Sequence, residues 1–238
     1  MKNAISILIF AVMVFTIGLQ TGFSQNKNQE YIKGAINLEK GNTLEGIEIL
    51  QNCISTGKNS DLAHLCLGKK YLKEKDFEKA KYHFYSANKA NSSIASFDLA
   101  RTFSLLNMPD SAVIMLEEHL NSQFKLTRPT ITLNKDFSNI ENTKQWRSLW
   151  EKPWYSEKET LLTEAEGLIN NKSFESALVI LDEYLANKKD HYAQFLRAKV
   201  FYSLQNTYNA IKDLDDAIKA RPGQSDYYKT RGEIFFSE

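Results

Sequence analysis

The chain has 238 residues, with 30 lysines and arginines against 29 aspartates and glutamates, and 42% of its residues are hydrophobic. Charges of both signs are interleaved along it, whereas proteins that bind nucleic-acid backbones carry a clustered basic surplus. No nucleic acid is therefore expected as a partner. A chain of this length is able to bury a continuous core without disulfide or metal support.

The first predicted element is a secretory signal peptide over residues 1–24. A positive start at Lys2 is followed by an apolar stretch over residues 4–19, and the small residues Gly22 and Ser24 precede polar sequence. This order is typical of a cleaved leader and predicts a periplasmic or secreted protein. An uncleaved membrane anchor is the alternative, but this stretch is shorter than the roughly 20 residues that a bilayer core requires. We expect no membrane span after cleavage.

After the leader, small and bulky residues recur with a period of about 34 residues. The clearest copy has small residues at Gly68, Ala80 and Ala87 and bulky ones at Tyr71 and Phe84. Small residues allow two helices to approach closely, and bulky residues fill the space to the next repeat. Because neither helix is able to bury its apolar face alone, the pairs must stack.

The same frame fits residues 27–60, 93–126, 158–190 and 191–224, and a sixth copy begins at Ser225. The third and fourth copies have His119 and Tyr184 where the last small residue is expected. The residues that match the frame are Gly34, Gly46, Leu50 and Cys53; Leu99, Ala100, Phe103, Ala112 and Leu116; Ala165, Leu168, Phe174, Ala177 and Leu181; Ala198, Phe201, Ala210, Leu214 and Ala217; and Tyr228, Gly232 and Phe235.

On these residues the chain resembles the tetratricopeptide repeat family over residues 28–126 and 158–238. The resemblance implies an all-α fold, a right-handed α-solenoid of antiparallel helix pairs whose first helices line a concave groove that binds peptides or protein surfaces. A generic helical bundle is the structural alternative. We expect an N-terminal array of about three repeats over 25–126, and two repeats plus the first helix of a third over 158–238.

Residues 127–157, here called the connector, interrupt the array. All three tryptophans of the chain lie in it, and Trp146 and Trp150 are four residues apart, on one face of a short helix. This face either plugs the joint between the third and fourth repeats or forms an exposed aromatic platform for a partner together with Trp154 and Tyr155. The connector also loosely resembles the linkers of repeat proteins exported by Bacteroidetes-like bacteria.

The repeat frame also predicts which side chains line the groove. In the central repeats an aromatic or aliphatic residue accompanies a cation, which suits a ligand that is apolar with some acidic character. Family members that clamp a chaperone's C-terminal tail use asparagine and lysine at set groove positions, which this chain does not provide. The predicted groove residues are Leu65, Lys69, Phe97, Arg101, Phe195 and Lys199.

No motif for catalysis, phosphate binding or metal binding is present in the sequence. His119 follows two glutamates but falls at an inter-helix position, so a packing or capping role is favoured over that of a general base. Cys53 and Cys66 are expected as free buried thiols, and neither His64 nor His83 has the short ligand spacing of a zinc site. We therefore expect no enzyme activity, cofactor or metal.

These patterns favour a non-enzymatic scaffold or adaptor in the cell envelope that binds a protein or peptide partner in its groove. The alternative is a structural subunit of an envelope assembly that docks through the connector and the apolar C-terminal end around Phe235 and Phe236. The sequence leaves the partner and the oligomeric state open.

Overall fold

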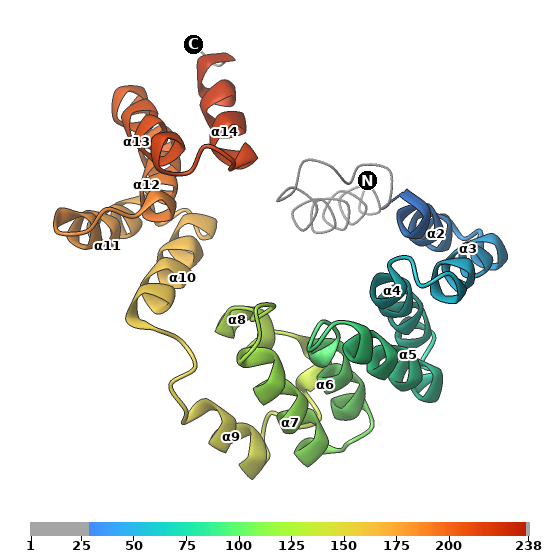
Figure 1. The fold of residues 1–238 in the computed structure, drawn as a ribbon. Helices are drawn as coiled ribbons and strands as arrows, with labels where there is room; N and C mark the ends of the chain where they lie inside the picture. Colours follow the sequence, from blue (N-terminus) through green and yellow to red (C-terminus); the bar gives the residue numbers. More distant parts are fainter. Residues whose placement is uncertain (1–28, 237–238) are drawn as a thin grey trace. The chain divides into compact units, whose positions relative to one another are not determined.

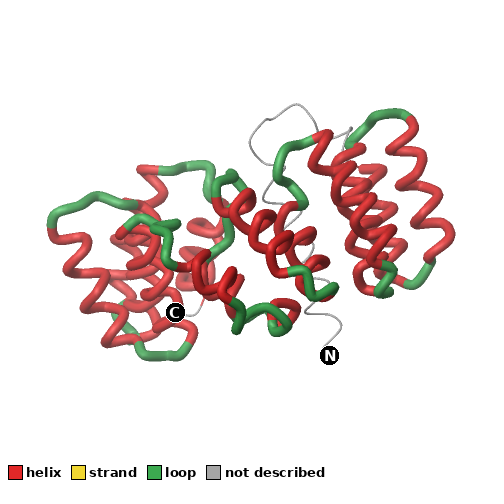
Figure 2. The backbone as a smooth tube through the Cα atoms, turned by 90° about the horizontal axis from the view of Figure 1, so that it is seen from below, coloured by secondary structure: helices red, strands yellow, loops and turns green. Residues whose placement is uncertain are grey.

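The protein is described by a computed structural model that covers residues 29–236, and all regular secondary structure in that range is helical (Figures 1 and 2). The chain divides into two compact units, Met1–Trp154 (unit 1) and Tyr155–Glu238 (unit 2). The predicted signal peptide, residues 1–24, lies outside the described residues. No helix within the described range combines the length and apolar character that crossing a membrane requires.

Both units are built from helix pairs that follow one another along the chain (Figure 1). Unit 1 contains α2 (Gln29–Lys40) with α3 (Thr43–Ser55), α4 (Ser60–Lys73) with α5 (Phe77–Ala90), α6 (Ser96–Leu105) with α7 (Pro109–Leu120), and then the short α8 (Arg128–Thr132), η1 (Lys135–Phe137) and α9 (Lys144–Trp150). Unit 2 contains α10 (Glu157–Asn170) with α11 (Phe174–Ala186), α12 (His191–Ser203) with α13 (Thr207–Ala220), and α14 (Ser225–Phe236). The all-α fold of antiparallel helix pairs predicted from the repeat frame is confirmed.

The turn inside each helix pair has one recurrent backbone geometry. A residue with positive φ, between 55° and 89°, follows the first helix of each described pair, and the next residue donates its N–H to a carbonyl five positions back, as from Asp76 to Tyr71 at 2.9 Å. This is the Schellman ending of a helix, which satisfies carbonyls that the helix itself leaves unpaired. The positive-φ residues are Gly41, Lys75, Asn107, Lys172 and Gln205.

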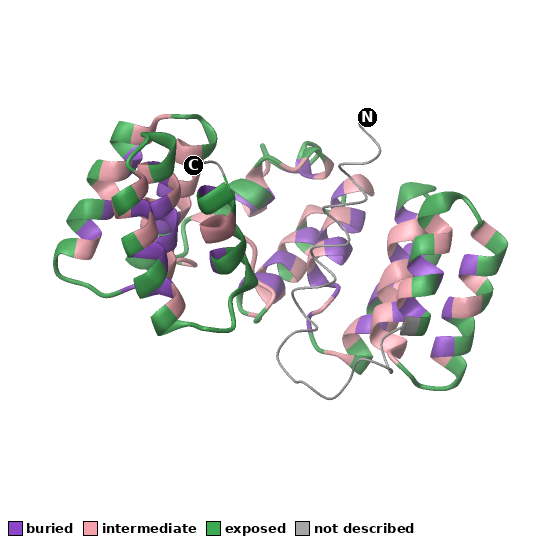
Figure 3. Cartoon of the chain, turned by 90° about the horizontal axis from the view of Figure 1, so that it is seen from above, coloured by how far each residue is buried: buried purple, intermediate pink, exposed green. Residues whose placement is uncertain are grey.

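The small residues of the frame are buried in all of the first five copies. In the second copy Ala80, Phe84 and Ala87 are fully buried, and a methyl group added to Gly68 would lie 2.4 Å from the Phe84 ring. Figure 3 shows the buried residues on helix faces that are turned toward neighbouring helices, with exposed residues on the opposite faces. The contact between helices therefore depends on the spacing that the sequence predicts.

The last helix, α14, is buried on one side only. Tyr227 and Ile234 are its buried residues, whereas Tyr228 and Phe235 are 42% and 57% exposed. No second helix follows α14 among the described residues. Only the side of α14 that contacts α12 and α13 is therefore covered.

The connector supplies further packing for unit 1. η1 contacts α6, and α9 contacts α7, so these short elements occupy the side of the third pair where a following helix pair would pack. Phe137, Ile140 and Leu149 are fully or almost fully buried there. The connector thus covers the apolar side of α6 and α7.

Candidate functional site

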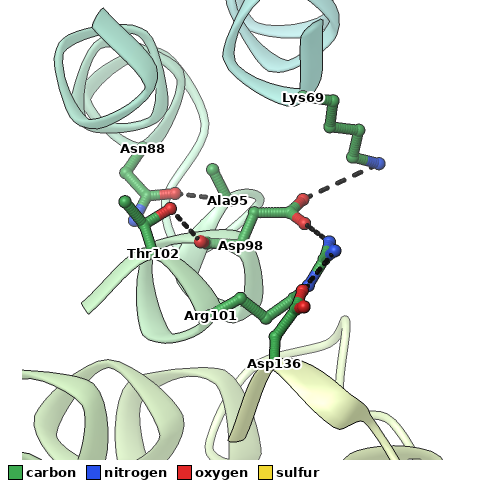
Figure 4. A network of polar contacts seen from close by, with 7 residues as sticks. All are labelled: Lys69, Asn88, Ala95, Asp98, Arg101, Thr102 and Asp136. Carbon is green, nitrogen blue, oxygen red and sulfur yellow. Dashed lines mark hydrogen bonds and ion pairs between the residues drawn. The ribbon is translucent and has the colours of Figure 1, made fainter. Parts of the chain in front are cut away.

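Two of the predicted groove cations, Lys69 and Arg101, meet in unit 1 around one buried carboxylate. Asp98 Oδ1 accepts a 2.6 Å hydrogen bond from Arg101 Nη1, and Asp98 Oδ2 lies 3.7 Å from Lys69 Nζ. Arg101 also donates through Nε to Asp136 Oδ2 at 2.8 Å (Figure 4). This network joins α4, α6 and η1, so Lys69 and Arg101 have a structural role that the repeat frame did not predict.

Two further hydrogen bonds lie beside this network, one within α6 and one between α5 and the start of α6. Thr102 donates its hydroxyl to the Asp98 carbonyl at 2.7 Å, and the Asn88 side chain on α5 accepts from the Ala95 N–H at 2.7 Å (Figure 4). The Asp98 side chain is only 7% exposed. A carboxylate buried to this extent needs charged partners, and Lys69 and Arg101 supply them to Asp98.

A hollow of about 460 Å³ opens beside this network, and we call it the cationic hollow. Lys73 and Lys75 are exposed at its rim, and no ion pair of either is found among the described residues. The site has four cationic side chains and the two carboxylates of Asp98 and Asp136, so its net charge is positive. The cations are Lys69, Lys73, Lys75 and Arg101. The hollow is lined by Lys69, Leu72, Lys73, Lys75, Phe77, Arg101, Leu105 and Asp136.

Sequence reasoning identified two of these eight lining residues and missed the other six. Lys73 and Lys75 lie at the turn between α4 and α5, next to the apolar residues Leu72 and Phe77. This combination of cationic and apolar residues is visible in the sequence and could have indicated the hollow. No signal in the sequence indicated Asp136, because this residue lies in the connector, 35 residues from Arg101. Its position follows from the packing of η1 on α6.

The remaining predicted groove residues lie in different surroundings. Leu65 is half-buried on α4, and Phe97 packs its ring against His119 and Phe137 at centroid distances of 5.3 and 5.8 Å. Phe195 and Lys199 belong to unit 2. Phe195 is 8% exposed, and Lys199 Nζ lies 5.7 Å from its ring centroid. The cationic hollow therefore contains residues of unit 1 alone.

The tryptophans of the connector do not share one environment. Trp146 is 7% exposed and packs against Phe137 and Trp150 at 5.3 and 5.6 Å between ring centroids. Trp150 is half-buried beside Arg128, and its Nε1 has no hydrogen-bond partner in the described structure. Trp146 is thus part of the core of unit 1.

Trp154 lies at a second hollow, of about 510 Å³, which we call the Trp154 hollow. The Trp154 indole donates to the Leu149 carbonyl at 2.6 Å, and Lys152 Nζ lies 5.6 Å from the ring centroid. Tyr155, the last residue of the predicted platform, is half-buried and begins unit 2. The Trp154 hollow is lined by Leu120, Asn121, Ser122, Lys125, Lys152, Pro153 and Trp154.

His119 has the packing and capping role that its position predicts. It is 3% exposed, and its Nε2 accepts the Leu126 N–H at 3.1 Å. Burial lowers the pKa of His119 to about 4, although the Asp98 charge acts in the opposite direction. The imidazole is therefore neutral at pH 7, which the accepted hydrogen bond requires.

The two cysteines are free, as predicted, but only Cys53 is fully buried, because Cys66 is partly exposed on α4. Burial raises the pKa of Cys66 to about 11, so this residue is a thiol rather than a reactive thiolate at neutral pH. Within residues 29–236, no three or more His, Cys, Asp or Glu side chains converge as a metal-binding group.

Comparison with solved structures finds a partial likeness to two proteins, among others. No protein-family model and no curated protein matches the chain. A crystal structure of PilW, described as a widely conserved type IV pilus biogenesis factor, is 16% identical with a TM-score of 0.44, over 87% of this chain and 98% of that one. PilF of Pseudomonas aeruginosa is 15% identical with a TM-score of 0.43, over 90% of this chain and all of that one.

Proposed function

We propose that the protein is a non-enzymatic interaction scaffold that binds an acidic, partly apolar segment of a partner protein in the cationic hollow. The observation that carries this proposal is the pairing of a positive rim with an apolar lining. Lys73 and Lys75 supply charge at the rim, and Leu72, Phe77 and Leu105 supply apolar surface. Complementary charge accelerates association and selects acidic partners, and the apolar contacts hold them.

The structure changes which residues are suitable for testing this proposal. Reversing the charge of Arg101 or Lys69 would place an acid beside buried Asp98, and a loss of binding would then follow from a loss of folding. Lys73 and Lys75 are exposed, so reversing their charge leaves the packing of unit 1 unchanged. They are therefore the better probes of the hollow.

We expect the Lys73→Glu/Lys75→Glu variant to bind a fluorescein-labelled decapeptide of alternating glutamate and leucine about tenfold or more weakly than the wild type, because two attractive charges become repulsive. Fluorescence anisotropy measures the affinity, and raising the salt concentration should weaken wild-type binding. The control is Lys172→Glu/Lys189→Glu in unit 2, where Lys172 occupies the same left-handed turn position as Lys75. Equal affinities in both variants and in the wild type would contradict a site in the cationic hollow.

A structural subunit of an envelope assembly remains the second candidate function. It is supported by the Trp154 hollow and by Phe235 and Phe236, which are 57% and 96% exposed on α14. In a pull-down from envelope extract, an acidic segment bound to the cationic hollow elutes at high salt. A partner docked on apolar surface is retained under the same conditions.

We further infer that the protein is exported, on the evidence of the leader-like pattern in residues 1–24. N-terminal sequencing of protein recovered from the envelope or the medium should begin near Gln25. Recovery of an intact Met1 in a membrane fraction would favour the uncleaved anchor instead.

A further inference from the structure

His64 on α4 and His83 on α5 point their rings at each other across the second helix pair. Their Nδ1 atoms are 2.9 Å apart, and their ring centroids are 5.1 Å apart. The two residues are 19 positions apart in the sequence, and the Gly68–Phe84 contact holds their helices together at this point. The pair is therefore positioned by the repeat's own core.

Aromatic neighbours restrict the orientation of both rings. Tyr71 stacks on His83 at 5.4 Å with an interplanar angle of 13°, and Tyr82 meets both histidines edge-on, at 6.2 Å from His64 and 5.1 Å from His83. Two half-buried imidazoles held in this way lose little freedom when they bind a common ligand.

The distance between the two Nδ1 atoms can be compared with the distance between two nitrogen ligands of one metal ion. Two nitrogens bound 2.0–2.1 Å from one ion lie about 2.9 Å apart at a right angle, and about 3.3–3.4 Å apart at the tetrahedral angle. The observed 2.9 Å is the length of a hydrogen bond between the two rings, and it also equals the separation of neighbouring positions in a tetragonal centre. Square-planar or tetragonal coordination by nitrogen and oxygen is typical of Cu(II) and Ni(II), and imidazole is a preferred ligand of both.

The local charges also permit a cation. Lys70 and Lys79 are the nearby cations, and they pair with Glu74 at 2.6 Å and Asp76 at 2.7 Å. Burial lowers the pKa of both histidines, that of His83 to about 4 with a further contribution from His64. Both rings are thus neutral at pH 7, as a metal ligand must be.

We propose that His64 and His83 form a two-histidine site for a divalent transition-metal ion with tetragonal preference, Cu(II) above all, with water in the remaining positions. In the metal-free protein one Nδ1–H donates to the other Nδ1. On binding, the donor ring loses its proton from Nδ1 and carries one on Nε2 instead. Both rings then turn so that their Nδ1 lone pairs point at one ion. The ion lies to the side of the line that joins the two Nδ1 atoms. The terminal ring torsion of histidine is broad enough to permit this turn.

Cu(II) titration of the purified protein tests the site. We expect one equivalent to bind with an electron paramagnetic resonance spectrum that shows coupling to two nitrogens. His64→Gln and His83→Gln should each weaken binding about a hundredfold or more, because loss of an outer-shell partner alone costs 10–100-fold in metal affinity. His191→Gln in unit 2 is the control and should bind Cu(II) as the wild type does.

Circular dichroism of the three variants establishes that they fold. Separate His64→Asn and His83→Asn variants provide a second, smaller replacement at each position if a glutamine disturbs the pair. Coupling to a single nitrogen, or unchanged Cu(II) affinity in folded variants at both positions, would overturn the proposal.

Discussion

Gly68→Leu is expected to lower the free energy of unfolding of unit 1 by about 3 kcal/mol, at the upper end of the usual cost of overpacking a core. The first added carbon alone would lie 2.4 Å from Phe84 Cε1 and 2.5 Å from Cδ1, and Phe84 is fully buried. The ring has no free space to enter, so α4 and α5 must separate. Urea unfolding followed by tryptophan fluorescence measures the effect, because all three tryptophans lie in unit 1.

Gly167→Leu is the matched control for this substitution. Gly167 lies inside α10, and a carbon added there meets no other atom within 4 Å. Because glycine is unfavourable in a helix by about 1 kcal/mol relative to alanine, this change should leave stability unchanged or raise it slightly. Unfolding followed by circular dichroism compares the two variants. Equal stability of Gly68→Leu and the wild type would show that the helix pair does not depend on a small residue at this position.

Trp146→Ala is expected to cost about 3–5 kcal/mol, the usual range for removing a buried aromatic side chain. Trp146 fills the space between Phe137 and Trp150, and a cavity would remain in its place. Urea unfolding monitored by the remaining tryptophans measures the loss. Arg147→Ala is the control, because Arg147 is exposed on the same helix.

The same experiment distinguishes the two predicted roles of the connector. An exposed platform residue contributes little to stability, so an unchanged free energy of unfolding in Trp146→Ala would contradict its burial. A partner that docks on the connector should instead depend on Trp154, which lines the Trp154 hollow. Binding assays on the connector are therefore better made with Trp154 variants than with Trp146 variants.

The sequence by itself determined the helix pairs. Closely packed helices require small residues at fixed positions, and the residues with this spacing, from Gly34 to Ala217, are buried as predicted. The turns are equally local, because a left-handed residue and one hydrogen bond across five positions end each first helix. Such features depend on neighbours within one repeat, and their recurrence along the chain identifies the frame.

Only the tertiary structure decided what the groove residues do. Arg101 bonds to Asp136 because the non-repeating connector packs on α6, and no period in the sequence encodes that contact. His64 and His83 meet because the facing sides of α4 and α5 bring together residues 19 positions apart. In α14, Tyr227 is buried whereas Tyr228 is 42% exposed, because a helix buries only the face that a neighbouring helix covers. Local periodicity determines which elements form, whereas contacts between elements that do not repeat determine where charge, aromatic surface and metal-ligating nitrogens gather.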